Sequence, residues 1–572
     1  MSIFLCMINL DGSAIDDSCK EMLISTIASD TNQHITFEYS DDNVFVISYD
    51  AGAFKCPAVI EDDIGFTLAV GDPIIRSSAN KNRLDDTQNI HESFRLGNSE
   101  SLHKARGVFA GVHYNRNDKF LRIFSDKLGV RPVFYYLDQN ILLFSSVFLY
   151  FERLSFLSLT EDIEGLAEDV AFISLADRTP YNNIKRILPA ELLEVKNGQF
   201  SRRCYWDWGR LSGKSYISSI SEPVQSAYNA FDEAVSLRLG DEKNAIAFLS
   251  GGLDSRCITA LVKRKVGGLN TFNFATEQSQ DGVLAQLYAE KLHSNHYETK
   301  EKKRSFSNLS QSIADASKHV FESSVNSPKY PHLVWSGDGG SVSAGFVYLN
   351  KEIILLLNEN KVEEAVECFL SSNNIGLPFR FFSAAYKDSM KSLLKNNICK
   401  ELAALKNVET DRKLYLFLMF NDQRRHLHLH FETIGKHKTE FLLPFFDANF
   451  LRIMFSISME DGLYHGFYMK WFEKFPVFAS ETPWQTYPKH EQCPLKMPEN
   501  LSYQWDDGKQ LIDESTRGVE VDKLIMMVIR KPKMSQYVNR FKVVTALLLF
   551  RLNIRDYSFL MPFLEKLNRY VK

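Results

Sequence analysis

The stretch NAIAFLSGGLDSRCITALVKRK, from Asn244 to Lys265, decides the fold of the central part of the chain. An apolar run typical of a buried strand leads into the turn SGGLDS, Ser250 to Ser255, and apolar residues at helical spacing follow. A Gly-Gly turn lets backbone N–H groups close around phosphate oxygens at the positively polarised N-terminus of a helix. The stretch therefore predicts a strand, a phosphate-binding loop and a helix.

The side chains of this turn indicate which phosphate ligand it suits. Ser250 and Ser255 can donate hydroxyl hydrogen bonds to phosphate oxygens, whereas Asp254 would repel them unless a cation such as Mg²⁺ lies between. The GxxxxGK[ST] pattern of another phosphate loop is absent from the sequence. A tight turn with a helix cap would also use Ser and Asp, but SGGLDS between strand and helix favours ATP phosphates.

The pattern on either side of the turn predicts the fold class. NTFNFAT reads as the next strand and DGVLAQLYAEKLH as the next helix, and this alternation is typical of a parallel α/β sheet. After about Leu349 the chain is expected to be mostly helical. The first ~200 residues instead contain short strand-like runs separated by turns, which predict packed antiparallel sheets: DNVFVISY, GFTLAVG, GVFAGVHYN, KFLRIFSD, PVFYYL and ILLFSSV.

Composition narrows the function classes. The chain has 572 residues, 45% hydrophobic and 24% charged, which is typical of a globular protein of several domains. A net charge of −4 disfavours a nucleic-acid partner, because such domains are usually basic. Eight cysteines without a CxxC pair favour the reducing cytoplasm, and no apolar run reaches the ~18 residues of a membrane span.

Several of these motifs resemble those of the asparagine synthetase family. SGGLDS is similar to its pyrophosphate loop, which holds ATP while a carboxylate is activated as an acyl-adenylate. VWSGDGGSVSAGFVYL (334–349) and KTEFLLPFFDANFL (438–451) are similar to two later signatures. GVFAGVHYNRNDKFLRIFSDKLGVRPVFYY (107–136) resembles the end of the family's glutamine-amidotransferase domain.

The resemblance implies an α/β multi-domain fold. Residues 1–208 would form an antiparallel β-sandwich domain of the class II glutamine-amidotransferase (Ntn-like) type. Residues 219–500 would form a parallel-sheet pyrophosphate-loop domain that binds ATP, with a largely helical C-terminal part, and 501–572 a helical extension. A homodimer is among the assemblies left open.

The resemblance also implies site residues. Nucleotide binding is implied for Ser250, Gly251, Gly252, Leu253, Asp254, Ser255, Ser336 and Gly337. Asp254 and Asp281 would hold Mg²⁺. Asp338 stands where the family has a catalytic glutamate and would orient or deprotonate an attacking amine. Lys489, with Lys496 as second choice, would stabilise charge in the transition state.

Departures from the family pattern indicate a changed activity. The chain begins Met1-Ser2 rather than Met-Cys, and the glutamine-holding segments are missing, so the first domain is predicted to be inactive as a glutaminase. An exposed N-terminal Ser2 acting as nucleophile is the alternative. Ser341 and Val342 replace acidic residues of the second signature, which removes one expected metal carboxylate. This pattern resembles β-lactam synthetases and lasso-peptide cyclases, in which the first domain keeps its fold but has lost the glutaminase activity.

The favoured function is therefore an ATP-dependent ligase that forms an amide from a carboxylate, releasing AMP and pyrophosphate. The acid could be a small molecule, a peptide or a sugar acid, and ammonia or a substrate amine would attack it. Glutamine-hydrolysing asparagine synthetase and a non-catalytic ATP-binding descendant remain the alternatives. A tRNA-modifying relative is disfavoured by the net negative charge and the amidotransferase-like first half.

One histidine-rich run stands outside this resemblance. RRHLHLHFETIGKH (424–437) is predicted to be helical, which places His426 and His430 on one face at i and i+4. No glutamate stands between them as in HExxH metal sites. Packing, or an anion pocket shared with Arg424 or Arg425, is therefore preferred to a metal site.

Overall fold

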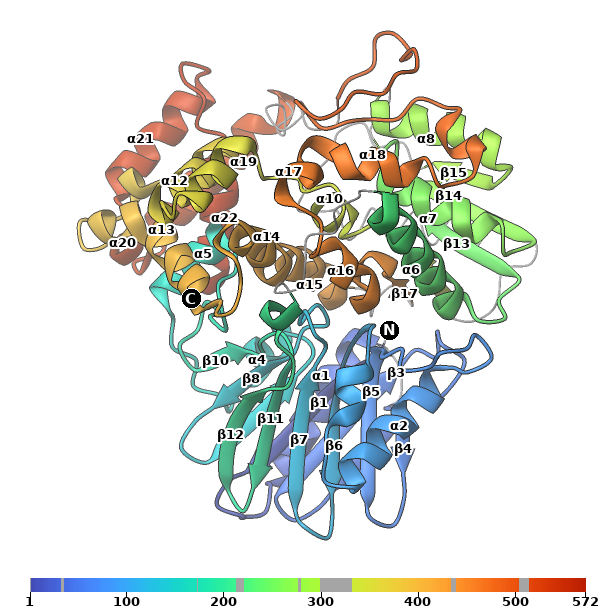
Figure 1. Cartoon of the computed structure of the whole chain (residues 1–572). Helices are drawn as coiled ribbons and strands as arrows, with labels where there is room; N and C mark the ends of the chain where they lie inside the picture. The colour runs from blue at the N-terminus through green and yellow to red at the C-terminus, as the bar shows by residue number, and fades with distance from the viewer. Residues whose placement is uncertain are drawn as a thin grey trace.

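The N-terminal part of the chain is a sandwich of two antiparallel sheets, drawn in blue to teal at the bottom of Figure 1. The computed structural model describes residues 2–31, 35–171, 173–211, 221–275, 279–298, 332–433, 439–503 and 514–571. One sheet has the order β10-β8-β9-β1-β3-β2, with bounds Ile184–Arg186, Phe134–Leu137, Ile141–Ser145, Ser2–Asn9, Val44–Asp50 and Phe37–Ser40. The other has the order β12-β11-β7-β6-β5-β4, with bounds Gln199–Cys204, Glu191–Lys196, Phe120–Ser125, Val108–Asn115, Gly65–Asp72 and Val59–Glu61.

Side chains along a strand point alternately to the two faces of its sheet, and this alternation places β1 between two layers. Phe4, Cys6 and Ile8 of β1 lie in the core between the two sheets. The alternate residues of β1 pack instead in the cluster that includes Leu23 and Ile27 of helix α1 (Asp17–Thr31). Helix α2 (Arg83–Arg95) covers the outer face of the second sheet. The predicted antiparallel sandwich is confirmed, and helices cover both of its outer faces.

The second part of the chain contains the predicted parallel sheet. Its order is β15-β14-β13-β16-β17, with bounds Asn295–Glu298, Gly268–Asn273, Asn244–Phe248, His332–Trp335 and Thr439–Leu442. All four neighbouring pairs are parallel. Helices α7 (Leu253–Lys263) and α8 (Gln280–Leu292) occur where the sequence predicts them, and α6 (Ser221–Leu239) precedes the first strand of this part. The edge strand β17 is an addition, because that region was expected to be helical.

The remaining chain is helical and returns to the first domain. Between β16 and β17 lie several helices, and after β17 come α16, α17, α18 and the C-terminal helices: α10 Gly340–Ser343, α11 Lys351–Asn358, α12 Val362–Ser372, α13 Lys387–Ala404, α14 Lys413–Phe417, α15 Arg424–Thr433, α16 Ala448–Met454, α17 Met459–Gly462, α18 Gly466–Phe472, α19 Glu514–Arg530, α20 Met534–Tyr537, α21 Arg540–Arg551 and α22 Leu560–Tyr570. Helix α22 packs on α5 (Ile163–Val170) of the sandwich domain.

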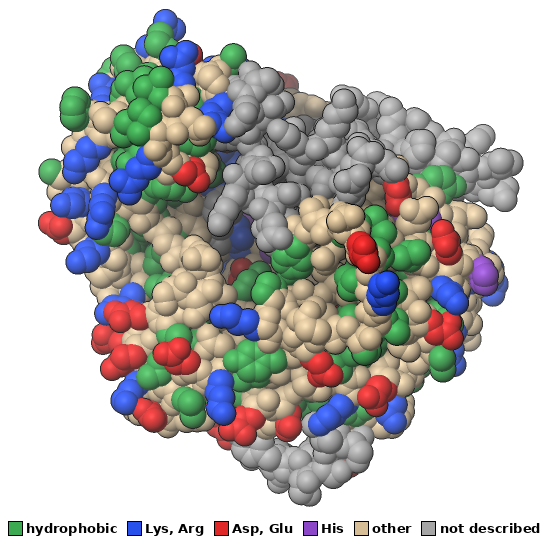
Figure 2. All heavy atoms as spheres, turned by 90° about the horizontal axis from the view of Figure 1, so that it is seen from above, with side chains coloured by type: hydrophobic (Ala, Val, Ile, Leu, Met, Phe, Trp, Pro, Cys, Tyr) green, Lys and Arg blue, Asp and Glu red, His purple; other side chains and the backbone are tan. Residues whose placement is uncertain are grey.

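Helix α22 contacts the sandwich domain through an ion pair with α5 and an aromatic contact with the segment after it. Lys566 Nζ lies 3.2 Å from Asp169 Oδ2, and the rings of Tyr181 and Tyr570 meet edge to face at 5.9 Å. The apolar run VVTALLLF (543–550) lies in α21, of which Leu547 is buried and Leu548 is 42% exposed. Figure 2 shows hydrophobic side chains gathered among Lys and Arg on the left, the side where Figure 1 draws the C-terminal helices.

Within the described ranges, no helix is long and apolar enough to cross a membrane.

Candidate active site at the switch point of the parallel sheet

The strand order of the parallel sheet fixes where a ligand can bind. From β13 the chain continues outward through β14 and β15 on one side, and β16 and β17 extend the sheet on the other. The order therefore reverses between β13 and β16. In open parallel sheets, ligands bind at the carboxyl ends of the strands where this reversal occurs. The SGGLDS turn follows β13, and the loop that begins at Ser336 follows β16, so both signature loops border this crevice.

The SGGLDS turn is prepared for an anion. Helix α7 has Gly252 at its N-cap, and no side chain caps it. The interpretation of SGGLDS as an ordinary side-chain cap is therefore wrong, and the helix N-terminus can receive an external acceptor. The hydroxyls of Ser250 and Ser255 lie 2.9 Å apart, and the Gly252 N–H donates to Ser250 Oγ at 3.2 Å. Leu253 is buried in the core, so its side chain anchors the turn.

The two signature loops touch through glycines. A Cβ on Gly337 would lie 2.9 Å from the Ser255 nitrogen, and one on Gly340 would lie 2.5 Å from Asp254 Cγ. Real Cβ atoms do not approach other atoms this closely, so neither position accepts a side chain without movement. The spacing GDGG in the sequence therefore reflects the close approach of this loop to the phosphate-loop aspartate.

Replacing Gly340 with alanine should consequently displace Asp254. Overpacking of this size costs about 1–3 kcal/mol, and we expect a lower Tm together with weaker binding of Mg²⁺–ATP. Gly376→Ala is the matched control, because a Cβ there meets nothing within 4 Å. Differential scanning fluorimetry and nucleotide titration measure both effects, and equal behaviour of the two variants would contradict the contact.

Asp254 lies between the loops in a network that the sequence did not reveal. Its Oδ1 accepts from the Tyr468 hydroxyl at 2.9 Å, and its Oδ2 from Ser341 Oγ at 2.7 Å. Tyr487 in turn donates to Ser341 Oγ at 3.3 Å. Burial raises the pKa of Asp254 to about 6, and the nearby negative charge of Asp338 acts in the same direction. The hydrogen bonds from Ser341 and Tyr468 lower the pKa and oppose this shift. Ser341, predicted as a lost metal ligand, thus contacts the aspartate that remains.

This environment fits a Mg²⁺ ion. Mg²⁺ keeps several waters and binds through one or two carboxylates plus substrate phosphates, so a single aspartate beside a phosphate loop satisfies it. A cation would also stabilise the charged form of Asp254, which burial disfavours. Asp281 is placed differently, since its Oδ1 accepts from the Gly251 N–H at 3.0 Å and its Oδ2 from Asn273 Nδ2 at 3.2 Å. These bonds fit a role in bracing the loop better than metal ligation.

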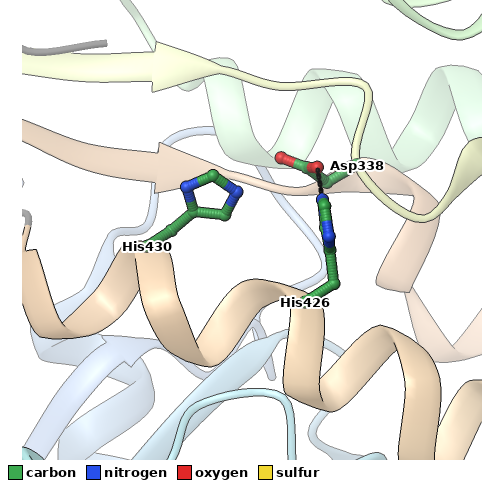
Figure 3. Close-up of side chains that lie close together, drawn as sticks. All are labelled: Asp338, His426 and His430. Atoms are coloured by element: carbon green, nitrogen blue, oxygen red, sulfur yellow. Dashed lines mark ion pairs between the residues drawn. The ribbon is translucent and has the colours of Figure 1, made fainter. Parts of the chain in front are cut away.

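Asp338 has two histidine neighbours on α15, as Figure 3 shows. His426 Nε2 lies 3.4 Å from Asp338 Oδ1, and Ser336 Oγ donates to Asp338 Oδ2 at 2.5 Å. Burial acts to raise the pKa of Asp338, but the His426 hydrogen bond and the charges of both histidines hold it below its usual range. Burial lowers the pKa of His430 to about 4, so this imidazole is neutral near pH 7.

Of the alternatives that the sequence left open for this run, an anion pocket formed with Arg424 does not fit the structure. The Arg424 guanidinium donates to the backbone oxygens of Ala176 at 2.6 Å and Ile187 at 3.4 Å, away from these histidines. The i, i+4 spacing of His426 and His430 was visible in the sequence. Their common partner Asp338 was not, because it comes from a different strand end far along the chain.

The loop that carries Lys489 borders the same crevice. The Gln485 N–H donates to the Gly251 oxygen at 2.8 Å, and buried Arg256 holds the preceding residues through the oxygens of Thr482 and Pro483. Lys489 is exposed and has a positive φ of 68°, and Lys496 is exposed as well. Their catalytic role stays a prediction.

The two aromatic residues of this loop behave differently. Trp484 is 3% exposed and packs on Phe472, so it anchors the loop. Trp484 and Tyr487 also border a cavity of about 370 Å³ beside Gln280. Tyr487 is therefore part of both the cavity wall and the Asp254 network.

Ser2 lies at the boundary of the two domains. Its side chain is buried, its hydroxyl donates to Asp50 Oδ1 at 3.0 Å, and Arg83 Nη1 donates to it at 3.1 Å. Its backbone nitrogen lies 3.3 Å from Glu440 Oε2 of β17, which Arg131 also pairs with. The hydroxyl is thus engaged by an ion pair, and whether it has any glutaminase role stays a prediction.

Comparison with known proteins matches both parts of the chain. Residues 78–206 match the family model described as glutamine amidotransferase domain, and residues 227–333 match the model described as asparagine synthase. The second match includes the SGGLDS turn and the strands β13 and β14 on either side of it. The chain is thus similar to asparagine synthases over this part. Its sandwich resembles the Ntn glutamine-amidotransferase fold.

Curated relatives share only part of their length with this chain. Glutamine-hydrolyzing asparagine synthetase 3 of Bacillus subtilis (strain 168) is 27% identical over 36% of this chain and 34% of the relative. A putative glutamine-hydrolyzing asparagine synthetase 2 of Methanocaldococcus jannaschii is 22% identical over 45% of this chain and 52% of the relative. The chain thus spans about a third to a half of the length of these relatives.

Among solved structures, the allosteric regulatory enzyme of purine biosynthesis aligns with 60% of this chain and 76% of its own. The sequence identity is 10% and the TM-score is 0.24, which does not establish a common fold.

Proposed function

We propose that this chain is an ATP-dependent ligase that forms an amide from a carboxylic acid through an acyl-adenylate. The observation that supports the proposal is the meeting of the two signature loops at the carboxyl ends of β13 and β16, where a helix N-terminus without a side-chain cap and the half-buried carboxylate of Asp254 lie together. ATP phosphates would lie against Ser250, Gly251, Gly252, Leu253 and Ser255, with Ser336 and Gly337 against the nucleotide. The N–H groups of Gly251 and Gly252 would then exchange their present acceptors, Asp281 and Ser250, for phosphate oxygens. Asp254 would hold Mg²⁺.

The residues of the crevice suit both halves of such a reaction. A substrate carboxylate oxygen would attack the α-phosphorus of ATP, and pyrophosphate would leave from the phosphate loop. An amine would then attack the acyl carbon, AMP would leave, and the amine proton would be lost. Asp338 would orient that amine, since its depressed pKa keeps it charged. Mg²⁺, when bound, would neutralise the charge of the phosphates.

The nitrogen would come from ammonia or a substrate amine rather than from glutamine. Burial of Ser2 and its hydrogen bonds to Asp50 and Arg83 support this, because a nucleophile must reach substrate. Asparagine synthetase itself, with aspartate as the acid, is the second candidate, and the family matches favour it. A glutaminase assay on the whole chain separates the two, since only the second candidate releases glutamate from glutamine.

Carboxylate-dependent exchange of labelled pyrophosphate into ATP tests the adenylation step without knowledge of the amine. We expect exchange with one class among a panel of amino acids, sugar acids and peptides, and no ADP. With an ¹⁸O-labelled carboxylate and an amine present, one ¹⁸O should appear in AMP. Label in inorganic phosphate would overturn the acyl-adenylate. Binding of Mg²⁺–ATP without any exchange would instead identify a non-catalytic descendant, an alternative that Ser341 in place of an acid keeps open.

A further inference from the structure

Three side chains from two elements gather beside the phosphate-loop crevice. Asp338 follows β16, and His426 and His430 lie one turn apart on α15. One ligand atom from each of the three lies within 4.8 Å of the others. The two imidazole rings meet edge to face at 5.4 Å. Two imidazoles and a carboxylate in this arrangement form a set of potential metal ligands.

We propose that Asp338, His426 and His430 bind a divalent transition-metal ion, for which Zn²⁺ is the best fit. The ligand set distinguishes this site from the Mg²⁺ position at Asp254, because imidazole suits Zn²⁺ whereas Mg²⁺ prefers oxygen ligands and water. His–His–carboxylate sets hold zinc through three protein ligands and leave one coordination position open. The family's own metal carboxylates contribute nothing to the proposed site.

The distances need little adjustment for such an ion. A tetrahedral zinc with bonds of about 2.0–2.1 Å holds its ligand atoms about 3.3 Å apart. His426 Nε2 and Asp338 Oδ1 are already 3.4 Å apart. The ligand atom of His430 lies within 4.8 Å of both, so an ion would draw His430 closer to this pair. Figure 3 shows the His430 ring turned toward the same space as the Asp338–His426 pair.

Neighbouring groups hold two of the three ligands in place. Ser336 donates to the Asp338 oxygen that faces away from His426, and the ring of Phe441 packs edge-on against His430 at 5.8 Å. Supporting contacts of this kind fix the orientation of ligands and are a regular part of metal sites. The His426 side chain is 48% exposed, which gives an ion a path from solvent and leaves room for a water or a substrate atom.

The proposed ion would lie close to the SGGLDS turn, since Gly337, the residue before Asp338, contacts Asp254 and Ser255. A water or amine bound to a divalent ion loses a proton more easily. The proposal concerns binding, however, and stands whether or not the chain is a ligase.

Titration of the whole chain with Co²⁺ and Zn²⁺, after dialysis against a chelator, tests the site. We expect one equivalent of Co²⁺ to give a visible d–d absorption band of the intensity typical of tetrahedral coordination, and Zn²⁺ to displace it. Asp338→Asn and His426→Ala should each weaken Zn²⁺ binding at least ~10–100-fold, since losing even a supporting partner has an effect of that size. Excess Mg²⁺ should leave the band unchanged.

His428→Gln is the matched control, because His428 lies on the same helix but packs against Phe134 and Phe148. This variant should keep the band and the Zn²⁺ affinity. Absence of the band in the unaltered chain would overturn the proposal. Equal Zn²⁺ affinity in the three variants would also overturn it, since the ion would then be bound elsewhere. Mg²⁺–ATP binding measured on the same samples reports separately on the nucleotide site.

Discussion

Asp254→Asn should lower the rate of carboxylate-dependent AMP release by ~100–1,000-fold, the size of effect seen when one preorganised group at a developing charge is lost. Asparagine keeps the shape of the side chain and can still accept from Tyr468 or Ser341, but it cannot neutralise Mg²⁺. The Tm should stay the same or rise, because the raised pKa shows that the buried charge of Asp254 opposes folding in the absence of a cation.

The combination of lost turnover and retained stability distinguishes a functional aspartate from a structural one. Ser341→Ala is the companion variant, since it removes a hydrogen bond to Asp254 and leaves the carboxylate in place. We expect a smaller loss of turnover, about 10-fold, for a net hydrogen-bond free energy of about 1.5 kcal/mol. A fall in Tm of the Asp254→Asn variant with unchanged AMP release would contradict the metal role. Steady-state AMP assays and scanning calorimetry measure both quantities.

Asp447→Ala should reduce the stability of the folded chain by about 3–5 kcal/mol, as expected when a buried ion pair loses one partner. Asp447 is fully buried and accepts from Arg106 Nε at 2.8 Å and Arg238 Nη1 at 2.9 Å. It also caps helix α16 through the Asn449 N–H. Its removal would leave two buried guanidinium groups without their shared carboxylate, at the junction of the sandwich domain, α6 and α16.

Glu233→Ala is the matched control for Asp447, because Glu233 pairs with the same Arg106 but its side chain is 48% exposed. Exposed pairs contribute about 0–1 kcal/mol, so the Tm should change little. Thermal and urea unfolding compare the two variants. A loss as large in Glu233→Ala as in Asp447→Ala would show that Arg106, rather than the buried aspartate, sets the stability of the junction.

The parts of the fold that sequence reasoning predicted are those with local signals. The apolar alternation of β1 and the strand–turn–helix of Asn244 to Lys265 are contained in short windows, so periodicity and turn chemistry identify them. Strand β17 was missed because its four residues follow a helical run and are specified by pairing with β16. That pairing joins residues about a hundred positions apart, which local patterns do not report.

The residues of the candidate site also fall into two groups, those that a local motif identifies and those that only the fold brings together. The phosphate loop is one continuous motif, whereas Tyr468 and Tyr487 reach Asp254 and Ser341 from separate segments. No spacing in the sequence connects these residues, because the fold brings them together through the packing of α18 and the loop after it. Asp338 and the two histidines were each noticed alone, and only the three-dimensional arrangement shows them as one cluster.

The docking of α22 on α5 has a practical meaning for anyone who wishes to study the domains in isolation. Lys566 and Tyr570 belong to the last described helix, yet their partners Asp169 and Tyr181 lie within the first domain. A shortened chain that stops after the ATP-binding region would expose the face of α5 that this helix covers. Cutting the chain at its domain boundary would therefore yield two damaged pieces, and biochemical dissection should rely on point substitutions.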